Sequence, residues 1–201
     1  DLMLGKNAQS RVIMFTSFNP AAGKTFSIMN LAASMALKKS KVIIVDLDLR
    51  KATLTKTFGK QHSGVAAYLN GKMDDYHSCI DELSSDLFLL PIGTLPPNPT
   101  ELLLTERFGK MIDELRKEYD YVFLDCPPID IVADASIITE KVDMTVFVLR
   151  AGRIDKSSLP YVEELYRNGK YKHMAMVINS VELLAKKYGY GRRGYGYGYG
   201  Y

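Results

Sequence analysis

The sequence predicts an α/β fold, a mostly parallel β-sheet with helices on both faces. Short apolar runs alternate along the chain with longer segments whose apolar residues recur at helical spacing. The short runs are continuously apolar, as in parallel strands that are buried on both faces. With 201 residues, of which 47% are hydrophobic and 24% charged, the chain can bury such a core without disulfides or a bound metal.

The predicted strands are apolar runs bounded by polar residues. The first, Arg11–Ser17, holds four consecutive apolar residues, and the second and fourth each end in an aspartate, Asp46 and Asp125. In chain order the predicted strands are 11–17, 41–46, 88–91, 121–125, 144–149 and 174–178.

The predicted helices lie between these strands. In residues 26–39 apolar side chains recur every three or four residues, which is the spacing of one helix face. A second helix is expected at 102–118, with a kink or break near Thr105. Further helices are expected at 133–140 and 156–167.

The C-terminal segment differs from the rest of the chain in composition. Residues 188–201 contain six of the thirteen tyrosines and six of the fifteen glycines. Because glycine at this density makes backbone ordering costly, we expect a flexible tail at 186–201 that follows a folded domain at 1–185. Residues 183–201 carry four basic residues and no acid, so the tail has a charge of +4 and the rest of the chain −1.

Composition excludes several classes of protein. The nearly neutral body argues against a general nucleic-acid surface. Cys79 and Cys126 form no disulfide framework, and the three histidines are scattered, so a zinc site is not expected. No apolar run approaches the roughly 18 residues that a membrane span needs. The chain begins at Asp1 without a methionine, and we interpret it as part of a longer protein.

A phosphate-binding loop is predicted between the first strand and the first helix. The segment Ser17-Phe-Asn-Pro-Ala-Ala-Gly-Lys-Thr25 ends in Gly-Lys-Thr, and consecutive backbone N–H groups at a helix N-terminus form a cradle for anions. Lys24 would reach the β- and γ-phosphates, and the Thr25 hydroxyl would bind Mg²⁺. The predicted nucleotide-binding residues are Asn19, Pro20, Ala21, Ala22, Gly23, Lys24, Thr25 and Phe26.

Aspartates follow two of the predicted strands. Asp46 ends one strand, with Asp48 two residues later, and Asp125 ends another. In an open α/β sheet, ligands bind outside the carboxyl ends of the strands, so these carboxylates should converge with Lys24 at one edge. We therefore expect Thr25, Asp46 and Asp125 to hold Mg²⁺, directly or through water.

Together these motifs resemble the bacterial tyrosine kinases of the polysaccharide co-polymerase type. The Walker A motif of that family is similar to Ser17–Thr25, its Walker A′ motif to Val42–Arg50 and its Walker B motif to Val122–Pro128. Leu95–Leu103 resembles another family segment, and a tyrosine-rich C-terminus is typical of the family. The resemblance covers about residues 10–201.

The resemblance implies an ATP- and Mg²⁺-dependent protein tyrosine kinase that phosphorylates its own C-terminal tyrosines, with Lys24, Asp46 and Asp48 as catalytic residues. Asp46, or else Asp48, would orient or deprotonate the incoming hydroxyl. The expected phosphoacceptors are Tyr188, Tyr190, Tyr195, Tyr197, Tyr199 and Tyr201.

The resemblance also implies partners and a location. The partners would be other copies of the chain, each tail entering a neighbour's cleft, and a membrane-spanning adaptor segment upstream or on a separate protein. The domain would lie in the cytoplasm, tethered to the inner face of the bacterial membrane, and control capsular or exopolysaccharide polymerisation and export.

Two features depart from the family pattern. The chain starts too late to contain the Glu-x-x-Arg-x-x-Arg helix that family members use for ring-like self-association. Ala21 and Ala22 stand where related loops often have glycine, so nucleotide affinity would suffer if either position needed a positive φ.

The main alternative is a partitioning or division-site ATPase of the same superfamily. Those proteins carry a second, signature lysine early in the loop, where this chain has Asn19. An iron–sulfur carrier would need paired cysteines. A structural Tyr/Gly-rich assembly protein would explain the tail but not the nucleotide motifs.

Overall fold

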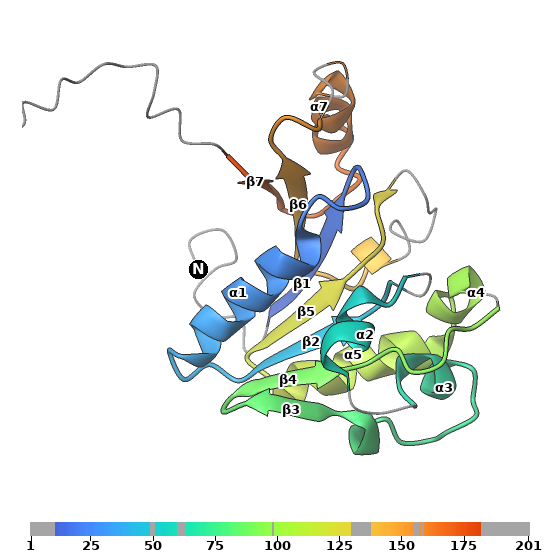
Figure 1. Ribbon diagram of the computed structural model, residues 1–201. Coiled ribbons are helices and arrows are strands. Elements are labelled where there is room, and N and C mark those ends of the chain that lie inside the picture. The colour runs from blue at the N-terminus through green and yellow to red at the C-terminus, as the bar shows by residue number, and fades with distance from the viewer. Residues whose placement is uncertain are drawn as a thin grey trace, which may run out of the picture.

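The computed structural model describes residues 11–48, 51–59, 63–97, 99–129, 138–154, 157 and 159–181. In this part of the chain seven strands form one sheet in the order β3-β4-β2-β5-β1-β6-β7 (Figure 1). All neighbouring strands are parallel except β3 and β4. The strands are β1 (Arg11–Ser17), β2 (Val42–Asp46), β3 (Asp81–Ser84), β4 (Leu87–Leu90), β5 (Tyr121–Asp125), β6 (Met144–Arg150) and β7 (Met174–Asn179).

The predicted strands are all present, and the sheet contains one more. The additional strand, β3, pairs antiparallel with β4 at one edge of the sheet. Its sequence, Asp-Glu-Leu-Ser, has no apolar run, so the pattern that revealed the other strands does not reveal this one. Asp86 adopts a φ of 65° in the turn that joins the two strands.

The described helices are α1 (Lys24–Ala36), α2 (Thr53–Phe58), α3 (Val65–Leu69), α4 (Pro99–Leu103), α5 (Glu106–Glu118) and α7 (Leu159–Arg167), with a 3₁₀ turn, η1, at His77–Cys79. Helix α1 ends three residues before the predicted Lys39, which adopts a φ of 66° that a right-handed helix cannot contain. The expected break at Thr105 is confirmed, because this residue is extended and separates α4 from α5.

Two predicted helices fall partly outside the described residues. Of the helix expected at 133–140, residues 133–137 are not described. The helix expected at 156–167 begins at Leu159 as α7, and neither residue 156 nor residue 158 is described. The short helices α2 and α3 were not predicted, because six and five residues are too few to show a helical period.

The sheet has a separate apolar cluster on each face. On one face Phe15 of β1 packs in a cluster with Ile28 of α1. On the other face Met14, the preceding residue of β1, belongs to a cluster with Met111 of α5. Figure 1 shows α1 and α5 on opposite sides of the sheet. The prediction of a parallel sheet with helices on both faces is therefore confirmed.

No helix within the described ranges is both long and apolar enough to span a membrane. The tail at 186–201, with all six expected phosphoacceptor tyrosines, and Arg50 of the Walker A′ segment lie outside the described residues.

Candidate nucleotide site at the carboxyl edge of the sheet

The predicted phosphate-binding loop lies between the end of β1 and the start of α1. Gly23, directly before α1, has a φ of +89°, a conformation that glycine adopts without steric cost. A Cβ atom there would also collide with the side chain of Asn179 at the end of β7. Both the backbone conformation and the close approach therefore require glycine at this position.

The two alanines of the loop have different environments. Ala21 is exposed and has a φ of 61°, in the left-handed region that residues with a Cβ atom avoid. Ala22 is only 5% exposed, packs in the cluster beneath α1, and is not among the residues with positive φ. Of the two positions that related loops often fill with glycine, this structure requires a positive φ only at Ala21.

Side chains from distant strands hold the carbonyl groups of this loop. Asn179 of β7 donates from Nδ2 to the carbonyl oxygen of Ala22 at 3.2 Å. Arg150 of β6 donates from Nη1 to the carbonyl oxygen of Ala21, also at 3.2 Å. Ser17 closes the loop locally by donating to the carbonyl oxygen of Asn19 at 2.9 Å. The loop is thus fixed by β6 and β7 as well as by its own sequence.

Lys24 and Asp125 form a buried ion pair across the site. They lie at the start of α1 and the end of β5, with side chains 10% and 1% exposed. Burial opposes the charge of Lys24, but attraction to Asp125 and the hydrogen bond between the two outweigh it, so the pKa of Lys24 is raised. Lys24 therefore remains a cation in the loop, the charge state that a lysine needs to bind phosphate.

Asp46 is completely buried at the end of β2, beside Asp125 in the neighbouring strand. Its Oδ2 accepts hydrogen bonds from the backbone N–H of Thr55 at 2.9 Å and from the Thr55 hydroxyl at 2.7 Å. Its Oδ1 accepts one from the backbone N–H of Asp48 at 3.2 Å. Burial, together with repulsion from Asp125, raises the pKa of Asp46 to about 6, and these hydrogen bonds oppose the rise.

A cavity of about 250 Å³ lies over the loop. It brings the loop together with Asp48 and Pro128, whereas Asp46 is fully buried and does not line it. The lining residues are Ser17, Pro20, Ala21, Ala22, Gly23, Lys24, Thr25, Asp48, Lys51, Thr53 and Pro128.

Two of the predicted nucleotide-binding residues lie outside this cavity. Asn19 lines an adjoining hollow of about 150 Å³, together with Arg150 and Arg153. Phe26 is 66% exposed on α1.

Several residues of the site were not predicted from the sequence. Lys51 and Thr53 line the cavity, and Thr55 binds Asp46, because α2 follows the Walker A′ segment and places its first turn beside β2. Their proximity to Asp46 in the sequence was a usable signal. Asn179 and Arg150 had no such signal, since more than a hundred residues separate each of them from the loop.

The donor set suits Mg²⁺ together with a polyphosphate. The Thr25 hydroxyl lies 3.5 Å from Oδ2 of Asp125, which places a hydroxyl and a carboxylate oxygen beside Lys24. Among the described residues no three acidic, histidine or cysteine side chains cluster closely enough to hold a metal by themselves. Mg²⁺ in nucleotide sites is commonly bound by one or two carboxylates, phosphate oxygens and waters, so the residues present fit this ion.

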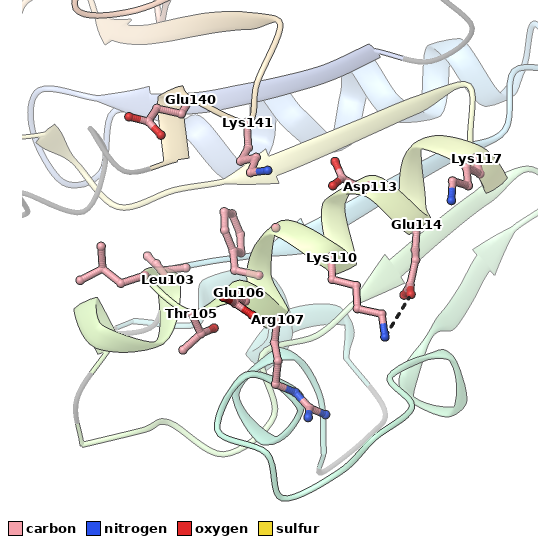
Figure 2. A pocket seen from close by; sticks show the side chains of 13 residues that line it. Leu103, Thr105, Glu106, Arg107, Lys110, Asp113, Glu114, Lys117, Glu140 and Lys141 are labelled. Carbon is pink, nitrogen blue, oxygen red and sulfur yellow. Dashed lines mark ion pairs between the residues drawn. The ribbon is translucent and has the colours of Figure 1, made fainter.

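A larger hollow, of about 780 Å³, lies along α5, away from the loop (Figure 2). Both acidic and basic side chains line it, and Lys110 and Glu114 form an ion pair at 4.0 Å. None of the predicted site residues lines this hollow. The phosphate-binding loop lines the cavity of about 250 Å³, and Lys24 of that loop pairs with the strand-end carboxylate of Asp125, so we take this cavity as the nucleotide site.

Comparison with known proteins shows the family of the chain. Residues 10–150 match the model of a family described as an AAA domain. The chain is 35% identical over 181 residues to the tyrosine-protein kinase CpsD of Streptococcus pneumoniae serotype 4 (strain ATCC BAA-334 / TIGR4), an alignment that covers 89% of this chain and 80% of that protein.

Two solved structures share the fold of this chain. The kinase domain of the Escherichia coli tyrosine kinase ETK superposes with a TM-score of 0.82 at 27% identity, covering 97% of this chain and 74% of that one. A chain of the MinC:MinD cell division protein complex of Aquifex aeolicus gives a TM-score of 0.64 at 21% identity, covering 84% of this chain and 68% of that one. The second likeness shows the fold alone.

The parallel sheet, the Gly-Lys-Thr loop and the strand-end carboxylates define a P-loop nucleotide-binding domain. Within that class, the chain belongs to the bacterial tyrosine-protein kinases of the CpsD and Wzc type. The resemblance to this kinase family, and with it the expectation of an enzyme, is confirmed.

Proposed function

We propose that this kinase transfers the γ-phosphoryl group of ATP to tyrosines of its own C-terminal tail, with the tail of one copy entering the site of another. The observation that carries the proposal is the ion pair between Lys24 of the phosphate-binding loop and Asp125 at the end of β5. Asp46 ends the neighbouring strand, β2, and Asp48, two residues later, lines the cavity. One cation and several carboxylates at the carboxyl edge of a parallel sheet suit phosphoryl transfer.

In the proposed mechanism each residue has a separate role. Lys24 exchanges part of its interaction with Asp125 for the phosphates and neutralises charge on the transferring group. Thr25, Asp125 and Asp46 would hold Mg²⁺, which when bound screens the phosphate charges. Asp46 or Asp48 orients the tyrosine hydroxyl and accepts its proton.

The tail is the proposed substrate because of its composition. Its six tyrosines alternate mostly with glycine, which lets a backbone enter a narrow site without side-chain clashes. The tyrosines of the described domain are less suitable: Tyr76 and Tyr171 are buried, and Tyr161 and Tyr166 lie within helix α7.

Regulation follows from the charge of the tail. Each phosphate adds about −1.5 to −2 charge, so several would reverse the +4 of residues 183–201 and weaken docking in a neighbouring copy. We propose that this cycle controls capsular or exopolysaccharide synthesis and export, with a membrane-spanning adaptor as partner and the inner face of the bacterial membrane as location. The relationship to CpsD supports this proposal.

A mixing experiment with labelled ATP and Mg²⁺ tests transfer between copies. One protein carries Lys24→Met with an intact tail, and the other is active but lacks residues 186–201. Neither alone should form tail phosphotyrosine, whereas the mixture should label the tail of the Lys24→Met protein. Lys38→Met, at an exposed position beyond the end of α1, is the matched control and should retain full activity.

The outcome also separates the alternatives. Label in Lys24→Met alone, or at Tyr76 or Tyr171, would contradict the proposed site or the proposed acceptors. Free phosphate without any phosphotyrosine in the unmodified protein would indicate an ATPase of the partitioning or division-site kind instead.

A further inference from the structure

We infer that Thr55 is a positioning residue whose hydroxyl fixes the orientation of the Asp46 carboxylate for phosphoryl transfer. The inference rests on the proposed role of Asp46. Thr55 lies in the short helix α2, and Thr53 is the residue of this helix that lines the nucleotide cavity.

The hydrogen bonds around the Thr55 hydroxyl leave it a single arrangement. Its oxygen accepts a hydrogen bond from the backbone N–H of Ile92 at 2.9 Å and lies 2.7 Å from Oδ2 of Asp46. An N–H group can only donate, so Ile92 occupies the acceptor side of the hydroxyl. The one hydroxyl proton is therefore directed to Asp46.

The two oxygens of Asp46 are consequently in different environments. Oδ2 receives both donors of Thr55, the hydroxyl at 2.7 Å and the backbone N–H at 2.9 Å. Within the described residues Oδ1 receives the backbone N–H of Asp48 at the longer distance of 3.2 Å. The terminal torsion of an aspartate is otherwise broad, so two donors on one oxygen select the rotation of the carboxylate. Oδ1, which accepts the single longer hydrogen bond, is then the oxygen with more remaining capacity to accept a further bond.

The other end of this chain of hydrogen bonds is anchored in the protein core. Ile92 is fully buried after β4, and its carbonyl oxygen accepts from the backbone N–H of Ala66 at 3.0 Å. The preceding carbonyl, of Pro91, accepts from the N–H of Val65 at 2.9 Å. Thr55 thus connects the carboxylate at the end of β2 to a fixed backbone segment beside the neighbouring strand, β4.

Three single substitutions test the inference. Thr55→Val keeps the shape but removes the hydroxyl, which is both the donor to Asp46 and the acceptor of the Ile92 N–H. Thr55→Ser keeps the hydroxyl, and Thr57→Val is the matched control. Thr57 lies on the same helix, is exposed, and donates only to the carbonyl oxygen of Thr53 at 2.8 Å in the described contacts. We expect Thr55→Val to lower the kcat of tyrosine phosphorylation roughly 10–100-fold, the usual effect of losing a partner of this kind. The KM for ATP should change little, and the other two variants should remain close to the unmodified protein.

A double-mutant cycle with Asp46→Asn shows whether Thr55 acts through Asp46. If it does, the double variant Asp46→Asn/Thr55→Val should be no slower than Asp46→Asn alone. Losses that multiply would overturn the inference, as would a normal kcat for Thr55→Val in a protein in which Asp46→Asn is slow. Thermal unfolding checks that each variant folds, and Thr55→Ala makes the same test if the valine variant does not.

Release of ADP, measured on the same samples, separates this inference from the proposed function. If the unmodified protein hydrolyses ATP but forms no phosphotyrosine, the transfer to the tail is wrong. Slower ADP release by Thr55→Val, restored in Thr55→Ser, would still support the positioning role. Unchanged ADP release by Thr55→Val would overturn it.

Discussion

Replacing Ala21 by glycine should stabilise the protein, although it lies in the loop that receives the nucleotide. Ala21 has a φ of 61°, and the left-handed conformation costs a residue with a Cβ atom roughly 1–2 kcal/mol. Glycine removes this cost but increases the entropy of the unfolded chain, which is worth about 0.4–1 kcal/mol in the opposite direction. The side chain is exposed, so no burial is lost. The expected net gain is on the order of 0.5–1 kcal/mol.

Ala22→Gly is the matched control and should act in the opposite direction. Ala22 is 5% exposed and packs beneath α1, so glycine there loses a buried methyl group worth about 0.8 kcal/mol. It gains no relief of backbone strain and increases unfolded-state entropy as well. The expected loss is therefore about 1–2 kcal/mol.

Thermal unfolding without nucleotide measures both effects. For a domain of this size a change of 1 kcal/mol in stability shifts the Tm by about 2–4 °C. The Tm should therefore rise in Ala21→Gly and fall in Ala22→Gly relative to the unmodified protein. Nucleotide affinity should be nearly the same in Ala21→Gly, because the loop adopts this φ before any ligand binds and the cost falls on folding. If Ala21→Gly lowers the Tm as much as Ala22→Gly does, the reasoning from backbone strain is wrong.

Three further predictions concern charged groups. Asp125→Asn leaves the buried Lys24 ammonium without its counter-charge and should lower the free energy of unfolding by about 3–5 kcal/mol in urea titrations. The pKa of Asp46 is about 6 in the folded chain and 3.8 in its ordinary, unfolded environment. Because the folded chain holds this proton more tightly, unfolding should become easier as pH rises from about 4 to 6. Asp46→Asn should weaken that pH dependence, and an unchanged slope would contradict it. His77 has a pKa raised above 6.5 by its hydrogen bond to Glu118, so its contribution to stability is complete below pH 6.5 and is lost as pH rises through the folded-state pKa. His77→Gln should therefore cost more stability at pH 6 than at pH 8.5 by denaturant titration, and equal costs at the two values would refute it.

The sequence by itself determined the framework of the site. Continuous apolar runs report strands buried on both faces, and parallel strands bring their carboxyl ends to one edge. Those two facts were sufficient to place the loop at residues 17–25 beside Asp46 and Asp125, and the structure pairs these two aspartates in adjacent strands. The helical spacing along α5 likewise located the long helix and its break at Thr105.

The tertiary structure alone decided how the side chains of the site are arranged. Asp46 and Asp48 are two residues apart in sequence and both are buried, yet only Asp48 lines the cavity. Nothing local distinguishes them, because the difference depends on where α2 packs and on the donors that Thr55 directs to Asp46. A helix of six residues is too short to have a period, and its position is set by contacts with the chain around it.

The same reason applies to the contacts that fix the loop. Asn179 and Arg150 reach Ala22 and Ala21 only because β6 and β7 follow β1 in the sheet, and strand order is not written in any one segment of the sequence. Periodicity records which face of an element is buried, whereas the partner that covers this face is chosen by the packing of the whole chain.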